Sequence, residues 1–441
     1  MTRRLSLWVL VCVAMASFFV VRFFEPPIAL SGSCDLEAKV REIKRQGFVS
    51  QIRTKEMIIK YYGEVGDLRA GDRIYVKGKC VDVRNVSEKH YSEKSARYWT
   101  GRGIYLQMYA KELKIVRKNY DLYTLRHDLI DFTDGKLDAM YGKDAPMIKA
   151  LVYGDRSEMS GELMEIFSKS GTAHILALSG FHVGILAVAI HVLLAKRSVQ
   201  SRGLIICVLL VFYAFLTGLR PSILRAVIFF GLYYLSFLRY EKFDLFSVSC
   251  MTASILLVIE PRYLYDRGFV LSFAGVNSIA LFYILLRQAV QKFRFASHPI
   301  TQAILVTISA QVLTLPLGWY YFGRLSIVSV LSNLIVMPLI SILMILAILS
   351  LFVHLLSLMM PFFYAMDLGL VASVRFLQSL VLRSNEFFSD LPYAYFDLEP
   401  LSTIELLIMY FVIFALYLIW ELHTIKENRY EPQRIKKIII E

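Results

Sequence analysis

Hydrophobic and polar positions divide the chain into three zones. Residues 5–24 form an apolar run, residues 31–170 are mainly polar, and residues 173–422 hold a series of apolar segments. A helix needs roughly 20 apolar residues to cross a bilayer. Together with the first run, the third zone therefore predicts about ten transmembrane helices. Its segments are 173–195, 203–219, 221–238, 245–259, 269–286, 301–318, 326–354, 362–382 and 404–422.

One of these segments, 326–354, is overlong and contains Pro338. Proline removes a backbone donor and clashes with the preceding helical turn. We expect this segment to be kinked or divided into two half-helices, which commonly line a path through a membrane.

The polar zone changes its periodicity along its length. Residues 47–116 contain short stretches that alternate between apolar and polar residues and are separated by glycine-containing turns. Such a pattern predicts strands, and their number and length favour a small closed β-barrel similar to an OB-fold. From residue 121 to 170 the spacing is helical, which predicts amphipathic helices on the outer membrane face or packed on the channel.

Composition and charge support a membrane protein and orient it. The chain is 56% hydrophobic, its mean hydropathy is +0.53 and its net charge is +13. With the N-terminus in the cytoplasm, the inward segments carry fifteen Lys and Arg residues and the short outward loops carry five. Because positive residues concentrate on the cytoplasmic side, we expect both termini in the cytoplasm, residues 31–170 in the periplasm and the inner membrane as the location.

The predicted fold class is thus an α-helical polytopic membrane protein with a small periplasmic OB-like β-barrel. Its expected parts, in chain order, are an N-terminal membrane anchor (1–30), the periplasmic OB-like domain (31–120), amphipathic helices (121–170), a membrane core (171–425) and a basic cytoplasmic tail (426–441).

The five cysteines differ in their surroundings. Cys12, Cys207 and Cys250 lie in apolar runs, where cysteine usually behaves as a small buried hydrophobe. Cys34 and Cys80 lie in the polar zone. If that zone is periplasmic, the two form a candidate disulfide; otherwise they are two free thiols.

Residues 171–184, here named the Ser/His run, place His174, Ser179 and His182 at the start of a predicted membrane helix. Polar groups are costly in hydrocarbon, so this cluster is a candidate functional site. On a single helix the three side chains would share one broad face. They could pack against neighbouring helices, line a channel, or act as a Ser–His nucleophile and base. Two histidines without further ligands do not indicate a metal site.

Other polar residues interrupt the apolar segments in the same way. Arg220 and Arg225 flank the start of one helix, and an arginine within a path is a natural contact for phosphate. The full set of candidates for a path or its gate is His174, Ser179, His182, Arg220, Arg225, Asp266, Gln311 and Asn333.

Basic and aromatic residues interleave in the predicted barrel. This mixture suits stacking on bases and attraction to a phosphate backbone, although it also fits an ordinary solvated basic surface. The candidate DNA contacts are Lys60, Tyr61, Arg73, Tyr75, Lys77, Tyr98, Trp99 and Arg102. The chain has no phosphate-binding loop of the G-x-x-x-x-G-K-[ST] type, so a partner or a gradient must drive any transport.

Four stretches, 151–184, 218–226, 265–274 and 311–338, resemble the ComEC-type competence protein family. The most specific are the Ser/His run and the Gly-Phe-Val-Leu-Ser-Phe sequence at 268–273. The resemblance implies a periplasmic OB-like loop with a Cys34–Cys80 disulfide and a membrane core that passes one strand of transforming DNA into the cytoplasm. Many long family members end in a metallo-β-lactamase-like domain. This chain has no such motif, so removal of the other strand is expected to fall to another protein.

These observations predict a channel for single-stranded DNA that is not an enzyme and needs no cofactor or metal. The lipid bilayer surrounds it, and the expected partners are a periplasmic DNA receptor and a cytoplasmic ATP-driven motor or single-strand-binding proteins. An intramembrane Ser/His hydrolase and a small-solute transporter remain as alternatives.

Overall fold

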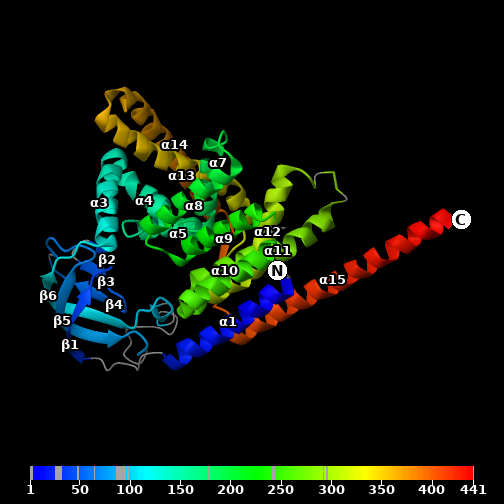
Figure 1. Ribbon diagram of the computed structural model, residues 1–441, viewed down its shortest axis with the longest axis horizontal. Coiled ribbons are helices and arrows are strands. Elements are labelled where there is room, and N and C mark those ends of the chain that lie inside the picture. The colour runs from blue at the N-terminus through cyan, green and yellow to red at the C-terminus, as the bar shows by residue number, and fades with distance from the viewer. Residues whose placement is uncertain are drawn as a thin grey trace.

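The computed structural model joins a six-stranded sheet to a bundle of helices (Figure 1). It describes residues 3–24, 32–46, 49–63, 65–85, 96, 99–176, 178–240, 244–291, 293–294 and 296–440. The sheet lies at one end of the molecule, and α3 connects it to the helices (Figure 1). The sheet domain is defined here as residues 32–117.

The sheet domain contains β1 (Gly32–Lys39), β2 (Glu42–Gln46), β3 (Val49–Arg53), β4 (Met57–Tyr61), β5 (Arg73–Asp82) and β6 (Leu106–Arg117). The strand order is β1-β5-β6-β4-β3-β2, and only the β4–β6 pair is parallel. The predicted closed barrel is therefore wrong, because β1 and β2 are the two edges and do not pair with each other in the described chain. Both edges come from one bent segment. At its corner the Val40 N–H donates to Asp72 and the Arg41 N–H to Arg53, so its two halves pair with different strands.

The two faces of the sheet differ sharply. Along β5, exposed and buried residues alternate, so that Ile74 and Val76 enter a core that also contains Ile52, Ile59 and Met108. Strand alternation then directs the charged residues outward. A disulfide joins Cys34 on β1 to Cys80 on β5, with the α-carbons 6.0 Å apart, which confirms the pairing implied by the family resemblance.

The bundle has ten apolar helices in the described chain. Seven are long enough to cross a membrane: α8 (Val199–Leu216), α9 (Pro221–Leu238), α11 (Arg267–Val290), α12 (Pro299–Phe322), α13 (Ser329–Met359), α14 (Tyr364–Asp390) and α15 (Thr403–Ile440). Three have shorter apolar stretches: Leu5–Val21 within α1 (Arg3–Phe24), α7 (Gly180–Leu193) and α10 (Leu245–Ile259). The protein is therefore a multi-pass membrane protein.

Three details differ from the sequence pattern. Helix α13 continues without a break through Pro338, so the division into half-helices is wrong, and the alternative, a kink, stays a prediction. The break lies instead in the segment 173–195, which forms a short α6 (Ala173–Leu176) and then α7. At the C-terminus the predicted basic tail continues α15 as far as Ile440, while Glu441 lies outside the described residues.

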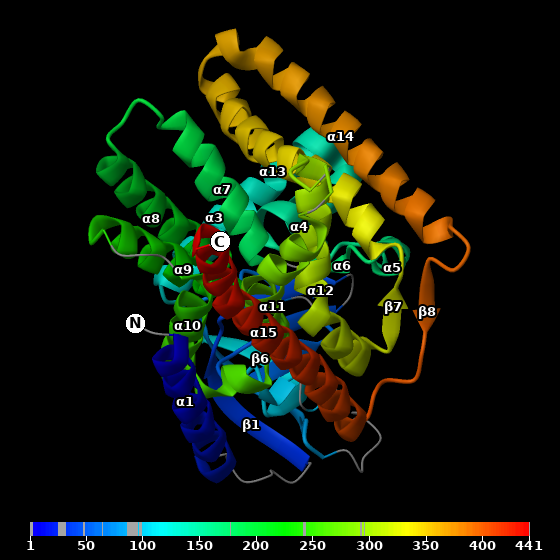
Figure 2. The same ribbon diagram turned by 90° about the vertical axis from the view of Figure 1, so that its right-hand side faces the viewer.

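Residues 121–176 pack along the bundle. They form α3 (Leu122–Tyr141), α4 (Ala145–Tyr153), α5 (Gly161–Lys169) and α6. The Tyr141 hydroxyl donates to Ser350 Oγ at 2.8 Å, and the Ser332 hydroxyl donates to the Ser170 carbonyl at 2.6 Å. The two α13 serines are about 27 Å apart at 1.5 Å per residue. This segment therefore follows α13, which lies beside α14 (Figure 2), over most of a bilayer thickness.

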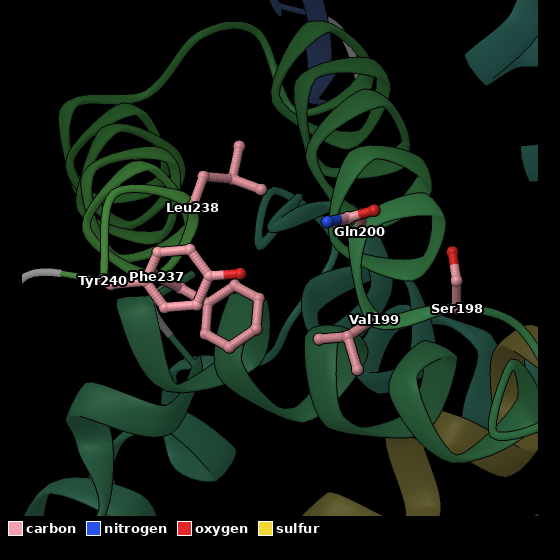
Figure 3. A pocket seen from close by; sticks show the side chains of 6 residues that line it. All are labelled: Ser198, Val199, Gln200, Phe237, Leu238 and Tyr240. Carbon is pink, nitrogen blue, oxygen red and sulfur yellow. The ribbon is translucent and has the colours of Figure 1, made fainter.

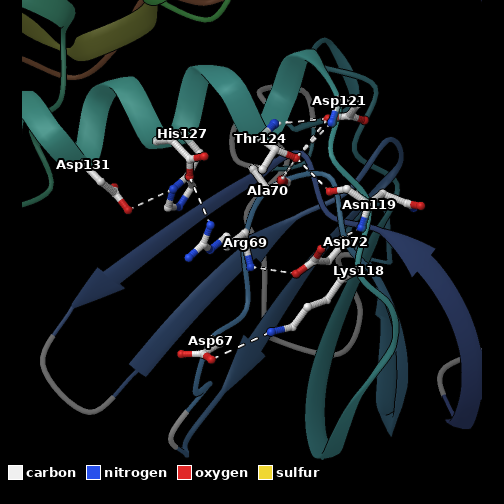
Figure 4. Close-up of polar contacts among 11 residues, drawn as sticks. Asp67, Arg69, Ala70, Asp72, Lys118, Asn119, Asp121, Thr124, His127 and Asp131 are labelled. Carbon is white, nitrogen blue, oxygen red and sulfur yellow. Dashed lines mark hydrogen bonds and ion pairs between the residues drawn. The ribbon is translucent and has the colours of Figure 1, made fainter.

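The first turn of α3 is fixed to the sheet domain (Figure 4). Asp121 accepts hydrogen bonds from the N–H groups of Tyr123 and Thr124, which caps the helix. The Thr124 hydroxyl donates to the Ala70 carbonyl at 2.8 Å. Because capping and anchoring use the same turn, the direction in which α3 leaves the sheet domain is set locally.

Candidate functional site

The Ser/His run is a broken helix rather than one continuous span. Ser179 has extended backbone angles (φ −119°, ψ 168°) and caps α7. Its N–H donates to His182 Nδ1 at 3.3 Å, and the His182 N–H donates back to the Ser179 carbonyl at 3.1 Å. The predicted shared helical face is therefore wrong, because this reciprocal cap starts a new helix and leaves His174 on α6.

The cap determines the tautomer of the neutral His182 ring. Since Nδ1 accepts the Ser179 N–H, the proton of a neutral imidazole lies on Nε2. His182 is fully buried, and its Nε2 has no hydrogen-bond partner among the described residues. Ser179 Oγ is also 3.1 Å from Nδ1, within reach for a nucleophile and base, but no carboxylate bonds to the ring in the described chain.

The segment between α6 and α7 contacts two distant parts of the chain at Leu178. The Ser222 hydroxyl, at the start of α9, donates to the Leu178 carbonyl at 2.6 Å. Gly154, which ends α4, has φ +76°, and a β-carbon built there would lie 2.6 Å from Leu178 and 2.7 Å from Arg220 Nη1. Only glycine fits this close contact and this backbone angle.

Arg225 reaches the first residue of α7. A β-carbon built on Gly180 would lie 3.1 Å from Arg225 Nη2. The guanidinium carbon is 5.4 Å from the centre of the Phe273 ring on α11, which is a cation–π distance. Arg225 is only 5% exposed, and its Nη1 has no partner among the described residues.

The start of the Ser/His run contacts the remaining family-like stretch. A β-carbon built on Gly171 would lie 2.5 Å from Ser329, and the Gln311 side-chain amide donates to Ser329 Oγ at 3.0 Å. The Thr172 hydroxyl donates to Asn385 of α14 at 2.6 Å, a contact that the sequence did not indicate. The stretches 218–226 and 311–338 thus contact the Ser/His run directly, and 265–274 is connected to it through the contact of Phe273 with Arg225.

Buried polar atoms without a partner in the described chain occur on seven of the ten apolar helices, among them α8, α10 and α14. The name polar seam is used here for four of these atoms: His182 Nε2 (α7), Arg225 Nη1 (α9), Asn277 Oδ1 (α11) and Asn333 Oδ1 (α13). Asn277 was missed, although a lone amide in an apolar helix is the same signal that selected Asn333. Native proteins leave few buried polar atoms unpaired, and such atoms call for an explanation.

The other predicted path residues have different surroundings. Asp266 caps α11 by accepting the Phe269 N–H at 2.8 Å, and its other oxygen is 3.5 Å from Arg102 Nε. It therefore connects the bundle to the loop before β6. His174 is exposed. Arg220 borders a polar cavity between the sheet domain and the helices. The cavity is lined by Arg41, Glu42, Ile43, Ala70, Arg126, His127, Ile130, Asp131, Asp134, Tyr153, Asp155 and Arg220.

Burial changes the acid–base behaviour of this cavity. It raises the pKa of the Asp134 carboxyl, although a hydrogen bond from Tyr153 and the nearby Lys149 act in the opposite direction. Burial also raises the pKa of Tyr153. Arg126 donates to the Leu216 carbonyl at 2.9 Å and so neutralises the C-terminal end of α8.

The sheet domain separates the predicted DNA contacts. Arg73, Tyr75 and Lys77 share the outward face of β5, and Lys60 lies on the same face, since both it and Lys79 pair with Tyr109 of β6. The Lys60 ammonium is 5.7 Å from the centre of the Tyr109 ring.

Three other predicted contacts are placed differently. Tyr61 packs against the core of the sheet domain, on the face opposite Lys60. Trp99 and Arg102 precede β6, on the side that meets the helices, and Tyr98 lies outside the described residues.

A larger pocket, of about 250 Å³, lies between the start of α8 and the end of α9 (Figure 3). Its lining contains no acidic or basic side chain: Ser198, Val199, Gln200, Phe237, Leu238 and Tyr240. Neither the polar seam nor the family-like contacts reach it.

Several known proteins are similar in sequence to this chain. ComE operon protein 3 of Bacillus subtilis is 30% identical over 221 residues, which cover 50% of this chain and 27% of that protein. Recombination protein 2 of Haemophilus influenzae is 24% identical over 306 residues, or 62% of this chain and 38% of that protein. An uncharacterized protein of Aquifex aeolicus is 29% identical over 262 residues, 59% of this chain and 58% of its own length.

The chain thus spans from about a quarter to somewhat over half of these relatives. No solved structure matches it. The model of the Competence protein family matches residues 151–423, which include every contact at the broken helix. The chain belongs to the Competence protein family.

Proposed function

We propose that this protein passes single-stranded DNA from the periplasm to the cytoplasm across a bacterial inner membrane, with both of its own termini in the cytoplasm. The observation that carries the proposal is the convergence of four family-like stretches on a broken helix beside the polar seam. Membership of the Competence protein family supports DNA as the transported molecule.

Physical chemistry favours a path at this place. Unpaired polar atoms are expensive in hydrocarbon, and irregular backbone is tolerated at membrane depth only where it is buried or faces water. Broken helices expose backbone groups that can meet a polar solute. A seam of polar atoms on α7, α9, α11 and α13 is therefore suited to a charged strand.

The sheet domain would receive the strand. One bent segment borders both edges, and β4 and β6 are parallel, an arrangement similar to the partly open OB-fold, which binds oligonucleotides. On its outward face Lys60, Tyr109 and Lys79 form a row across three strands. Such a row offers a ring for base stacking between two positive charges.

Direction must come from elsewhere, because the sequence has no ATP-binding loop. We therefore include a periplasmic DNA receptor and a cytoplasmic ATP-driven motor, or single-strand-binding proteins that trap the strand, as partners. The lipid bilayer is the remaining partner.

The test uses a naturally competent host that lacks its own competence-family channel and expresses this chain. Fluorescent DNA should enter the cytoplasm with the intact chain. Asn333→Leu and Asn277→Leu remove unpaired amides, so both should preserve protein level and lower DNA entry at least fivefold. Thr307→Val is the control, because Thr307 is half-buried and its hydroxyl donates to the Ala303 carbonyl of its own helix. Equal entry in all variants would contradict a path along the seam, and accumulation of DNA in the periplasm with the intact chain would contradict the function.

The Ser179–His182 contact supports one alternative, an intramembrane hydrolase. Ser179→Asn separates the two, because asparagine caps helices as well as serine but is no nucleophile. A channel should retain DNA entry in this variant, whereas a hydrolase should lose its activity completely.

A further inference from the structure

Helix α7 begins inside the bundle with an unusual set of neighbours. It has 14 residues, and its first residue is Gly180. The N-terminal turn of a helix carries backbone N–H groups without intrahelical partners and a partial positive charge, so it attracts anions. Arg225 Nη2 lies against this turn, close enough that a β-carbon on Gly180 would come within 3.1 Å of it.

The charge of Arg225 is not balanced by a carboxylate. Arginine stays protonated, and no acidic side chain pairs with Arg225 among the described residues. Phe273 covers a face of the guanidinium, and Nη1 at its edge has no partner among the described residues. A buried charge of this kind is strongly unfavourable unless it is paired.

Further donors surround the same turn. Neutral His182, two residues along α7, holds its proton on Nε2, which has no acceptor in the described chain. The Ser179 cap already accepts the His182 N–H, so the remaining donors at this turn are the N–H groups of Gly180 and Phe181, Arg225 Nη1 and His182 Nε2. An oxyanion is the chemical group that would accept hydrogen bonds from these donors.

We propose that Arg225 and the first turn of α7 form a phosphate-binding site within the membrane core. Its ligand is a phosphate group, and the identification of that group with the backbone of a DNA strand rests on the proposed function. The planar guanidinium can hold two phosphate oxygens, and the absence of a side chain at Gly180 lets a third oxygen approach the backbone N–H groups.

The test uses the full-length protein purified in a phosphate-free maltoside detergent. Thermal midpoints are measured in sodium phosphate and in sodium chloride of equal ionic strength, and a fluorescent oligothymidylate is titrated in parallel. Phosphate should raise the midpoint of the wild type, and the oligothymidylate should bind and compete with phosphate. Arg225→Gln should abolish the phosphate shift and weaken oligothymidylate binding at least tenfold.

Two further variants keep the test decisive. Arg239→Gln removes an exposed arginine at the other end of α9 and should behave as the wild type. Gly180→Ala keeps the charge of Arg225 but adds a methyl group at 3.1 Å from Nη2, and should weaken phosphate binding. Since Arg225→Gln removes an unpaired buried charge, its midpoint in chloride should equal or exceed that of the wild type.

The outcomes separate the sources of the phosphate. An unchanged phosphate shift in folded Arg225→Gln would overturn the site. A phosphate shift without competition by the oligothymidylate would overturn the assignment to a DNA backbone, leaving a site for free phosphate. If the intact chain binds phosphate at Arg225 but admits no DNA in the competent host, the proposed function fails while the anion site stands.

Discussion

The Cys34–Cys80 disulfide should be a major source of stability for the sheet domain. It closes a loop with a sequence separation of 46 residues and crosslinks edge strand β1 to β5. In the chain-entropy description, a crosslink over a loop of this length destabilises the unfolded chain by about 4 kcal/mol. Reduction should therefore lower the unfolding free energy of the sheet domain by about this amount.

The assay is pulse proteolysis of the full-length protein in detergent across a urea series, with cleavage mapped to residues 32–117. Replacing the free cysteines Cys12, Cys207 and Cys250 by serine removes thiols that could exchange with the disulfide during unfolding. For a urea dependence of about 2 kcal/mol per molar, the midpoint should fall by about 2 M on reduction.

A Cys34→Ser/Cys80→Ser variant should have the same urea midpoint as the reduced protein, and reductant should not change that midpoint. If the oxidised and reduced proteins share one midpoint within about 0.5 M, the loop-entropy reasoning is refuted for this domain.

Three further predictions concern the helices beside the sheet domain. Gly154→Ala, at φ +76° and 2.7 Å from Arg220 Nη1, should lower the thermal midpoint and DNA entry together, and an unchanged midpoint would show that the contact can relax. Lys149 is 3% exposed and binds two carboxylates at 2.8 and 2.9 Å. Lys149→Met should therefore lower the unfolding free energy of the protein by about 2 kcal/mol, whereas Lys143→Met, at an exposed position, should leave it almost unchanged in the same denaturation assay. Because burial raises the folded-state pKa of Asp134, its ionised form opposes folding, so Asp134→Asn should stabilise the protein at pH 7 and the gain should vanish toward pH 4; a gain independent of pH would contradict this.

Apolar run length and strand alternation were enough to locate most of the elements. Nine of the ten apolar segments became single helices, because burying the backbone in lipid leaves a long apolar run few alternatives to a helix. Alternation along 73–80 likewise placed Ile74 and Val76 in the core and Arg73 and Lys77 outside.

Local chemistry explains where these rules failed. The Ser/His run is apolar enough for a continuous helix, but α6 ends at Leu176 and the reciprocal cap between Ser179 and His182 starts a new helix. At Pro338 a break was expected, but helix α13 continues through the proline. The barrel prediction failed because the edge strands β1 and β2 pair with β5 and β3 and not with each other in the described chain. A pattern of hydrophobicity contains no information on such backbone partners.

Three of the four residues of the polar seam were predicted from the sequence, but their spatial arrangement was not. Arg225 was selected as an arginine in an apolar helix, yet its position against Gly180 depends on the tertiary packing of α7 and α9. The packing of the helices also leaves the buried polar atoms of the seam without partners in the described chain. An unpaired buried polar atom costs about 1–3 kcal/mol, so replacing Asn277 or Asn333 by leucine should cost little stability or even raise it. A bundle that only needed to fold would gain from apolar residues there. The amides are explained if the seam faces a polar solute, which would supply in transit the hydrogen bonds that the neighbouring helices do not.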